Sequence, residues 1–376
     1  TVQAMDRTRR ADRGFPAGCF RQDHRISRID KIKTYPVHPA NPVILSSCHP
    51  VNITTLEPYD MHYRTLGRTG LNVSVAGLGC GGHSRLGTAY GKDDQHAASI
   101  VRLAVELGVN FIDTARTYKT EPAVALALKD LDRDKLVLSS KAGLWPAEEN
   151  EPLVSADEFE NRLENSLKTL GVDTLDLYHV HGLIDTQIDH LLDEIMPVLH
   201  RAKAAGKVRH LAVSEVFHHD PGHRTLPELM SRCDDFDVMM VGFNALNPSA
   251  RERVLPLTVE RNIGVEVMFA VRKALTNPEH LRKTVAELVE QGQVDRDAVE
   301  LDDPLGFLID DDTPTVMDAG YRFCLHEPGC HSVLFGTGNP DHLRENIASM
   351  GKGPLSPEKQ DALRKIFGRV DSVSGN

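Results

Sequence analysis

Four side chains able to hold or transfer a proton follow three successive apolar segments of the chain. They are Asp113 and Tyr118 after residues 109–112, Lys141 after residues 136–140 and His181 after residues 175–180. In a parallel α/β barrel, the C-terminal ends of the strands meet at one face, where side chains converge on a shared site. We therefore expect these four side chains to lie together.

The combination predicts acid–base chemistry on a carbonyl group. Tyrosine is ordinarily a weak acid, with a reference pKa of about 10. An adjacent ammonium group favours the phenolate, so we expect Lys141 to lower the pKa of Tyr118 and Asp113 to hold and partly neutralise the lysine. Tyr118 would then donate a proton to a carbonyl oxygen whose carbon receives a hydride, and His181 could donate a hydrogen bond to the same oxygen.

The elements that position these residues alternate between strand-like and helix-like segments from residue 61 onward. Residues 63–66 and 71–73, on either side of a glycine-bounded turn, predict a β-hairpin. Eight further strands are predicted at 74–79, near 110, 136 and 175, and at 208–213, 236–241, 264–268 and 332–335. Most of them start about 25 to 40 residues apart, which is the length of a βα unit in a parallel sheet.

Helix signals lie between the predicted strands. Asp93 caps an amphipathic stretch that ends at Gly108, and Ser155 with Glu158 forms a capping box before a helix that ends at Gly171. Eight such βα units in about 300 residues predict a closed (β/α)8 TIM barrel with an N-terminal β-hairpin and C-terminal helices.

The segment after the first strand argues against an open, doubly wound sheet. Such a sheet would need a G-x-G-x-x-G loop there, and the Gly-Cys-Gly-Gly of residues 79–82 lacks that spacing. The longer interval before the last strand leaves 295–312 as an acidic insertion. We interpret the three aspartates 310–312 as the solvated start of a helix.

The composition limits the classes of function. The chain of 376 residues is 40% hydrophobic and 26% charged, with a net charge of -11, which is typical of a globular protein and disfavours a nucleic-acid surface. No run of about 18 apolar residues predicts a membrane span. The six cysteines form no C-x-x-C pair, so we expect free thiols and a cytoplasmic location. A small-molecule substrate is the expected partner, and the oligomeric state stays open.

Residues 1–60 differ from the barrel domain that we assign to 61–376. They include a Pro/His-rich stretch at 35–50 and little hydrophobic periodicity, so we interpret them as a disordered extension. Because Thr1 is not an initiator residue and Met61 opens the periodic part, sequence upstream of the native protein or a passive tail is our preferred interpretation. The alternatives are a targeting peptide, which the acidic residues disfavour, and an interaction tail.

Several motifs together resemble signature positions of the aldo/keto reductase superfamily. They are Asp113-Thr114-Ala115-x-x-Tyr118, Lys141, Asp176-Leu177-Tyr178-x-x-His181, the opening motif at 63–71, the Gly-Lys-Val-Arg of 206–209 and the segment 336–346. The resemblance covers roughly 63–367. It implies an NAD(P)-dependent carbonyl reductase or an alcohol or aldose dehydrogenase, with the cofactor lying extended across the barrel top. Asp113, Tyr118, Lys141 and His181 match the catalytic tetrad, with Tyr118 as general acid in reduction and general base in oxidation.

The same resemblance implies where the cofactor binds. The corresponding positions are Gly79, Cys80, Ser214, Glu215, Met268, Gly336, Thr337, His342, Glu345 and Asn346. Ser214 matches the residue that hydrogen-bonds the nicotinamide carboxamide, and the last three, with Thr337, match the segment around the adenosine end. Trp145 follows the third strand, so it could form a wall of the substrate pocket.

Three positions near the nicotinamide depart from the family pattern. Glu215 stands where asparagine is usual, Met240 where glutamine is usual and Met268 where many members have an aromatic ring. Recognition of the carboxamide is therefore in question at Glu215 and Met240. The thioether of Met268 can still pack against a flat ring.

Two positions near the adenosine also depart from the pattern. Gly336 and His342 stand where lysine and arginine commonly meet the 2′-phosphate of NADP. A dianionic phosphate favours fixed cations, and Arg344 or Arg272 could substitute for them. Between NADP and NAD, we lean slightly to NAD or to the use of both.

Other classes of function stay as alternatives. The barrel could bind the cofactor yet act as a regulatory or assembly subunit with little turnover. It could also be an unrelated barrel, such as a metal-dependent hydrolase that uses its histidines, but the histidines and aspartate in 218–223 match no zinc motif, and we interpret that segment as a solvated loop. His179 lies two residues before His181, so strand alternation places it one layer deeper in the barrel.

Overall fold

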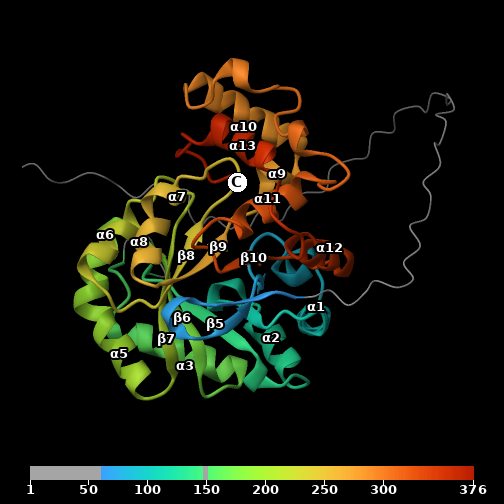
Figure 1. Cartoon of the computed structure of the whole chain (residues 1–376). Coiled ribbons are helices and arrows are strands. Elements are labelled where there is room, and N and C mark those ends of the chain that lie inside the picture. The colour runs from blue at the N-terminus through green and yellow to red at the C-terminus, as the bar shows by residue number, and fades with distance from the viewer. Residues whose placement is uncertain (1–60, 147–150) are drawn as a thin grey trace, which may run out of the picture. The chain divides into compact units, whose positions relative to one another are not determined.

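The computed structural model describes residues 61–146 and 151–376. Within these residues, eight parallel strands form a closed barrel in the order β10-β3-β4-β5-β6-β7-β8-β9 (Figure 1). They are β3 (Ala76–Gly79), β4 (Phe111–Asp113), β5 (Val137–Ala142), β6 (Leu175–Leu183), β7 (Val208–Glu215), β8 (Val238–Gly242), β9 (Gly264–Met268) and β10 (Ser332–Phe335). The predicted (β/α)8 barrel is confirmed, whereas the extension assigned to 1–60 lies outside the described residues.

The predicted hairpin consists of two short antiparallel strands, β1 (Tyr63–Thr65) and β2 (Asn72–Ser74). Ser74 pairs with Tyr63 in this hairpin, and for that reason the first barrel strand begins at Ala76 and not at residue 74 as expected. The strand β7 continues to Glu215, two residues beyond its predicted end.

The hairpin fills the N-terminal end of the barrel with apolar side chains. Leu66 and Val73 form a buried cluster with side chains from five consecutive barrel strands, namely Phe111, Val137, Leu177, Ala212 and Val238. Because side chains alternate along a strand, the residues two positions further on, such as Ser139 and His179, face the interior one layer above this cluster. The polar residues of the site therefore lie directly above a layer of buried apolar side chains.

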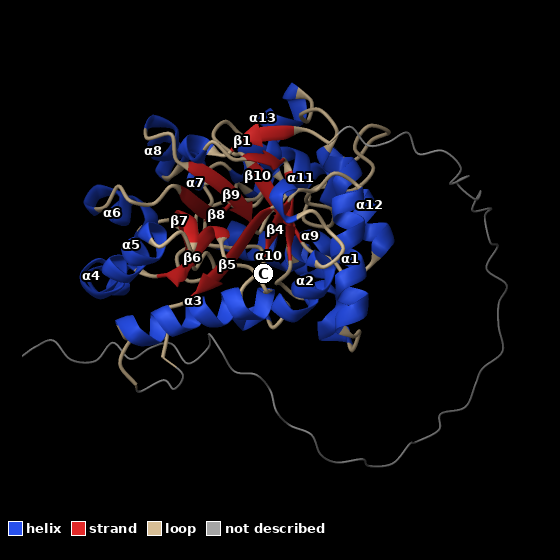
Figure 2. Cartoon of the chain, turned by 90° about the horizontal axis from the view of Figure 1, so that it is seen from below, coloured by secondary structure: helices blue, strands red, loops and turns tan. Residues whose placement is uncertain are grey.

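Helices follow the strands and lie outside them (Figure 2). They are α1 (Asp94–Glu106), α2 (Glu121–Leu128), α3 (Ala156–Leu170), α4 (Ile188–His190), α5 (Met196–Ala204), α6 (Thr225–Arg232), α7 (Ala250–Arg253), α8 (Leu255–Glu260), α9 (Lys273–Thr276), α10 (Pro278–Glu290), α11 (Val316–Leu325), α12 (Pro340–Met350) and α13 (Pro357–Phe367). Two predicted caps are present: the Asp93 side chain accepts from His96 N at 2.8 Å, and that of Ser155 from Glu158 N at 3.3 Å.

The long segment between β9 and β10 includes α9, α10 and α11, which pack against one another near the C-terminus in Figure 1. The interpretation of 310–312 as the start of a helix is wrong, because α11 begins at Val316 after the cap Thr315. Asp310 instead pairs with Lys359 at 2.6 Å, and Asp312 with Arg322 at 2.7 Å. These ion pairs tie the acidic insertion to α13 and α11.

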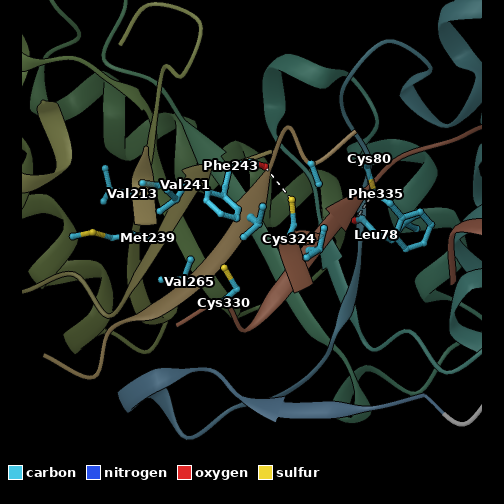
Figure 3. Packing of buried hydrophobic residues seen from close by; sticks show 14 of the residues in the cluster. Leu78, Cys80, Val213, Met239, Val241, Phe243, Val265, Cys324, Cys330 and Phe335 are labelled. Atoms are coloured by element: carbon cyan, nitrogen blue, oxygen red, sulfur yellow. Dashed lines mark hydrogen bonds between the residues drawn. The ribbon is translucent and has the colours of Figure 1, made fainter. Parts of the chain in front are cut away.

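The main core lies between the barrel and its helices. Figure 3 shows part of it, where Cys324 packs beside Phe243 and its thiol lies 3.3 Å from the Phe243 carbonyl oxygen. Cys80, Cys324 and Cys330 are buried and free. Across 61–146 and 151–376, no helix has the length and apolar character needed to cross a membrane.

Candidate active site

The C-terminal ends of β4 and β5 bring Asp113 and Lys141 together as a buried ion pair. Lys141 Nζ donates to Asp113 Oδ1 and, at 2.8 Å, to the carbonyl oxygen of Thr114. The side chains are 0% and 3% exposed. Burial lowers the pKa of Lys141, but the charge of Asp113, its hydrogen bond to the lysine and the nearby Tyr118 and Glu266 together raise this pKa above its ordinary value, so the lysine is held as a cation.

Tyr118 faces this ion pair from the short turn Arg116–Tyr118 that follows β4. Lys141 Nζ lies 5.0 Å from the centre of the phenol ring, and the phenol oxygen lies 3.3 Å from His181 Nε2. The ring also rests directly on Gly81, where an added Cβ would lie 2.6 Å from it. A side chain at residue 81 would therefore displace the tyrosine.

The pKa of Tyr118 corrects one sequence expectation. Burial raises this pKa, and although Lys141 acts in the expected, lowering direction, its effect is the smaller one. The net shift in the protein is upward. Tyr118 is consequently a protonated phenol at neutral pH, available as a proton donor.

His181 lies at an irregularity of β6, where the register with β7 shifts between Val180 and Leu183. The next residue, Gly182, has a φ of 67° and donates its N–H to Ser214 Oγ at 2.8 Å. Burial, together with the charge of Lys141, lowers the pKa of His181 to about 3. The imidazole is therefore neutral, and the structure brings all four residues predicted for the tetrad together.

A second polar layer lies beneath the tetrad. Ser139 Oγ lies 3.1 Å from Asp113 Oδ1 and 3.1 Å from His179 Nδ1, and His179 Nε2 lies 3.4 Å from Glu266 Oε1. His179 is thus one layer deeper than His181, as the alternation predicts. Sequence reasoning missed Glu266, although a charged residue inside the apolar strand β9 was the available signal.

Of the predicted cofactor residues on β7, Ser214 is buried at the strand end, but Glu215 is turned into the protein. The Glu215 carboxylate accepts from Gly242 N at 2.7 Å and lies 2.9 Å from His223 Nδ1, and the side chains of Glu215 and His223 are both 0% exposed. Both oxygens of Glu215 are therefore engaged by the protein itself. Glu215, which stands where asparagine is usual in the family, therefore has its own partner in this protein, His223.

The segment 218–223 is only partly the solvated loop that we expected. His218 and His219 are exposed, but Asp220 and His223 are buried. Asp220 accepts hydrogen bonds from the backbone N–H groups of Arg224 and Thr225 at 2.7 and 2.8 Å, which orders the loop before α6. Within the described part of the chain, no group of three or more His, Cys, Asp or Glu side chains could hold a metal ion.

Met268 ends β9, half-buried, and the aromatic ring follows one position later. Phe269 has a φ of 66°, and its ring lies 5.6 Å from Phe217, centre to centre. The guanidinium of Arg272 stacks on Phe269 at 4.0 Å from the ring centre. Arg272 Nη1 also lies 3.5 Å from where a Cβ on Gly82 would be, which places this cation on the Tyr118 side of the site.

The ends of β3 and β10 meet through their backbones. A Cβ on Gly336 would lie 2.7 Å from the carbonyl oxygen of Gly79, so residue 336 has no room for a side chain. A Cβ on Gly79 would lie 3.4 Å from the carbonyl oxygen of Phe335, in ordinary contact. Cys80 donates its N–H to Asp113 O at 2.8 Å, and burial raises the pKa of its thiol. Thr337 is buried, and its hydroxyl oxygen accepts from Asn339 N at 3.0 Å.

The predicted adenosine-side residues lie on α12. His342 and Glu345 are exposed, whereas Asn346 and Arg344 are half-buried. The Arg344 guanidinium donates to the carbonyl oxygen of Pro340 at 3.2 Å. Two side chains able to carry positive charge, His342 and Arg344, therefore project from the first turns of this helix.

Trp145 follows β5 and lies beside the strand end that carries His181. A Cβ on Gly143 would lie 3.3 Å from the indole Cδ1, and one on Gly182 would lie 3.9 Å from the indole Nε1. The indole is half-buried. Its role as a wall of the substrate pocket stays a prediction.

The closed parallel barrel and the strand-end cluster define the class of protein: a (β/α)8 enzyme with its polar site at the C-terminal ends of the strands. The profile of the Aldo/keto reductase family matches residues 78–367, and the chain belongs to this family. It is therefore an oxidoreductase, and the resemblance seen in the sequence motifs is confirmed.

Relatives of known sequence agree with this assignment. The uncharacterized oxidoreductase YqkF of Bacillus subtilis is 27% identical over 312 residues, which cover 81% of this chain and 96% of the relative. The NADH-specific methylglyoxal reductase of Escherichia coli is 26% identical, over 76% of this chain and 92% of the relative. The holo form of aldo-keto reductase AKR11C1 from Bacillus halodurans has the same fold, with a TM-score of 0.62, 23% identity and coverage of 82% and 97%.

Proposed function

We propose that the protein interconverts a carbonyl compound, namely an aldehyde, a ketone or an aldose, and the corresponding alcohol, using NAD or NADP and Tyr118 as general acid and base. The observation that carries the proposal is the position of the Tyr118 hydroxyl, 3.3 Å from His181 Nε2 and above the Lys141–Asp113 ion pair. Family membership supports the reaction class.

The residues at the strand ends fit a nicotinamide nucleotide at most positions. Gly79 and Gly336 leave bare backbone between β3 and β10, Ser214 offers a hydroxyl, and His342 with Arg344 offers nitrogen donors to phosphate groups. Glu215 does not fit, because His223 and Gly242 occupy its carboxylate. When bound, the nicotinamide ring would supply or accept the hydride.

The protein supplies the proton and the polarisation. In reduction, the neutral His181 imidazole orients the carbonyl oxygen by a hydrogen bond, and the Tyr118 phenol donates its proton to that oxygen. Lys141 stabilises the phenolate that remains, while Asp113 fixes the lysine. In oxidation, the phenolate removes the proton from the alcohol. Trp145 forms part of the substrate wall.

For the cofactor, we propose NAD or dual use. Gly336 has no room for the side chain that could reach a 2′-phosphate, and His342 is a weaker fixed cation than arginine. The Escherichia coli relative is named NADH-specific, which supports the same preference. Comparison of the Michaelis constants for NADH and NADPH tests it, and a preference for NADPH of about a hundredfold or more would contradict it.

The reaction is tested by following cofactor absorbance at 340 nm over a panel of aldoses, aldehydes and ketones with both cofactors. Tyr118→Phe should lower turnover by about 100-fold or more. Tyr90→Phe, at an exposed tyrosine of the segment between β3 and α1, is the matched control and should retain activity. Loss of activity only with a chelator would support a metal-dependent enzyme instead. No turnover over the whole panel would support a regulatory or assembly subunit.

A further inference from the structure

The second polar layer contains a buried carboxylate that the proposed reaction does not use. Glu266, on β9, is 0% exposed, and neither of its oxygens has a hydrogen-bond partner among the residues that the structure describes. The facing group is the imidazole of His179 on β6, three strands away around the barrel, with Nε2 at 3.4 Å from Glu266 Oε1. The contact therefore spans the barrel interior.

A bare carboxylate in this place would be costly, because burial removes its hydration and no hydrogen bond from the described residues replaces it. The cost is avoided when one proton resides on the pair, either on Glu266 as a neutral acid or on His179 as an imidazolium facing the carboxylate. Both arrangements have zero net charge. They differ from an ionised Glu266 beside a neutral imidazole by one bound proton.

Hydrogen-bond directions connect this pair to the tetrad. Ser139 Oγ donates its only proton to Asp113 Oδ1, so it must accept at its contact with His179 Nδ1, and that nitrogen must carry a proton. The order of donation is thus His179 to Ser139, and Ser139 to Asp113. Asp113 receives a second donor, Lys141 Nζ.

We propose that His179 and Glu266 jointly hold one proton in the barrel interior, and that His179 is a positioning residue of the proposed active site which, through Ser139, fixes Asp113 against Lys141. The inference rests on the proposed function for its kinetic consequence but not for the proton. The titratable groups that face the pair are Lys141 of β5, which acts on Glu266, His181 of β6, which acts on His179, and Asp113 of β4, which reaches His179 through Ser139. Tyr118 and Cys80 lie beyond them and act on Lys141. The facing residues of β7 and β8, Ser214 and Met240, do not titrate.

Two near-isosteric variants separate the two contacts of His179. His179→Asn retains a donor in the position of Nδ1, facing Ser139, and loses the contact with Glu266. His179→Gln retains a group in the position of Nε2, facing Glu266, and loses the donor to Ser139. We expect His179→Gln to lower kcat about tenfold with the cofactor dissociation constant unchanged, and His179→Asn to lower it less than threefold.

Ser139→Ala removes the same link from the other side and reproduces the His179→Gln effect even if that variant does not fold. Equal kcat values for His179→Gln, His179→Asn and Ser139→Ala would overturn the positioning role. A matching fall in cofactor affinity for His179→Gln would do the same, since it would indicate a general loss of structure.

The proton is tested by spectroscopy of the full chain at pH 7, which needs no turnover. Either an infrared carboxylic-acid band that disappears in Glu266→Gln, or imidazolium nitrogen resonances that disappear in His179→Gln, is expected. An ionised Glu266 together with a neutral His179 would overturn the proposal. If the wild-type protein turns over no carbonyl compound, the proposed function fails, while this measurement still decides whether the pair holds its proton.

Discussion

The two halves of the strand-end face differ in how their charges are arranged. On β4, β5 and β6, the charged groups belong to one connected set, in which Asp113 contacts Lys141 and Lys141 lies beneath Tyr118. On β7 and β8, Glu215 is paired instead with His223 from a nearby loop, and its remaining bond goes to a backbone N–H. In the first half, Asp113 and Lys141 thus compensate each other beside Tyr118 across two strands, whereas Glu215 in the second half is engaged by one loop residue and one backbone N–H.

This difference indicates which changes an active site of this kind tolerates. A group of the first half cannot be replaced alone, because each buried charge depends on the next for compensation. In the second half, Glu215 stands in place of the usual asparagine, and His223 is its local partner. Around Gly79 and Gly336, the strand ends contact each other through backbone atoms. Side chains in the second half can therefore differ from the family pattern, provided that each buried polar group has a hydrogen-bond partner.

Removal of the Lys141 cation from the first half is expected to have the largest effect on turnover. Lys141→Met should lower turnover by about 1,000-fold, because the phenolate of Tyr118 would form without a neighbouring positive charge. Cofactor affinity should stay within several-fold. Steady-state kinetics and cofactor titration measure the two quantities. Lys135→Met, at an exposed lysine just before the same strand, is the control. Turnover equal to that of the wild type would refute the role of Lys141.

In the second half, the expected effect is on stability. Glu215→Asn restores the residue common in the family but leaves His223 buried without its partner, so the free energy of unfolding should fall by about 3 kcal/mol. Chemical denaturation gives this value, with Glu106→Asn at an exposed helix end as the control. A loss below about 1 kcal/mol, or tighter cofactor binding, would show that Glu215 faces the cofactor after all.

Sequence patterns were sufficient for the fold and for the first half. The apolar runs locate the strands, and the alternation within β6 predicts His179 one layer beneath His181. Residue types at the ends of β4 and β5 sufficed because the tetrad is close in sequence to the strands that carry it. The order of these residues in the sequence therefore predicts their order around the barrel.

The remaining features depend on contacts that no local pattern contains. The sequence shows the ammonium group next to Tyr118 but not the extent of burial, so it gave the wrong direction for the pKa. Glu266 faces His179 only because the barrel closes, and Asp312 meets Arg322 only because the acidic insertion folds back on α11. Such pairings become visible when the chain is folded.

Two substitutions sharpen the comparison at the cofactor end of the second half. His342→Arg places a fixed cation at an exposed position on α12 and should lower the Michaelis constant for NADPH about fivefold. Gly336→Lys should give no such gain, because its Cβ would lie 2.7 Å from Gly79 O and would push β10 away from β3. Kinetics with both cofactors measure the effects. An equal gain from the lysine would mean that the two strand ends separate easily.

The smallest expected effect concerns pH. His181 has a pKa lowered to about 3 by burial and by Lys141, whereas a histidine in the unfolded chain titrates near pH 6.5. The folded chain therefore binds fewer protons at this residue between those values, and its contribution to stability decreases as the pH falls below about 6.5. In the folded protein, however, the imidazole stays neutral throughout that range.

The rate of reduction should consequently vary less than about twofold between pH 5 and pH 9, since neither His181 nor the phenol of Tyr118, whose pKa burial raises, changes its charge there. The measurement is kcat with a saturating carbonyl substrate across that range. An inflection near pH 6.5 would mean that His181 titrates as an exposed histidine does, and hence that the first half opens to water during turnover. A flat profile would mean that Asp113, Lys141 and His181 keep their protonation states while the reaction proceeds.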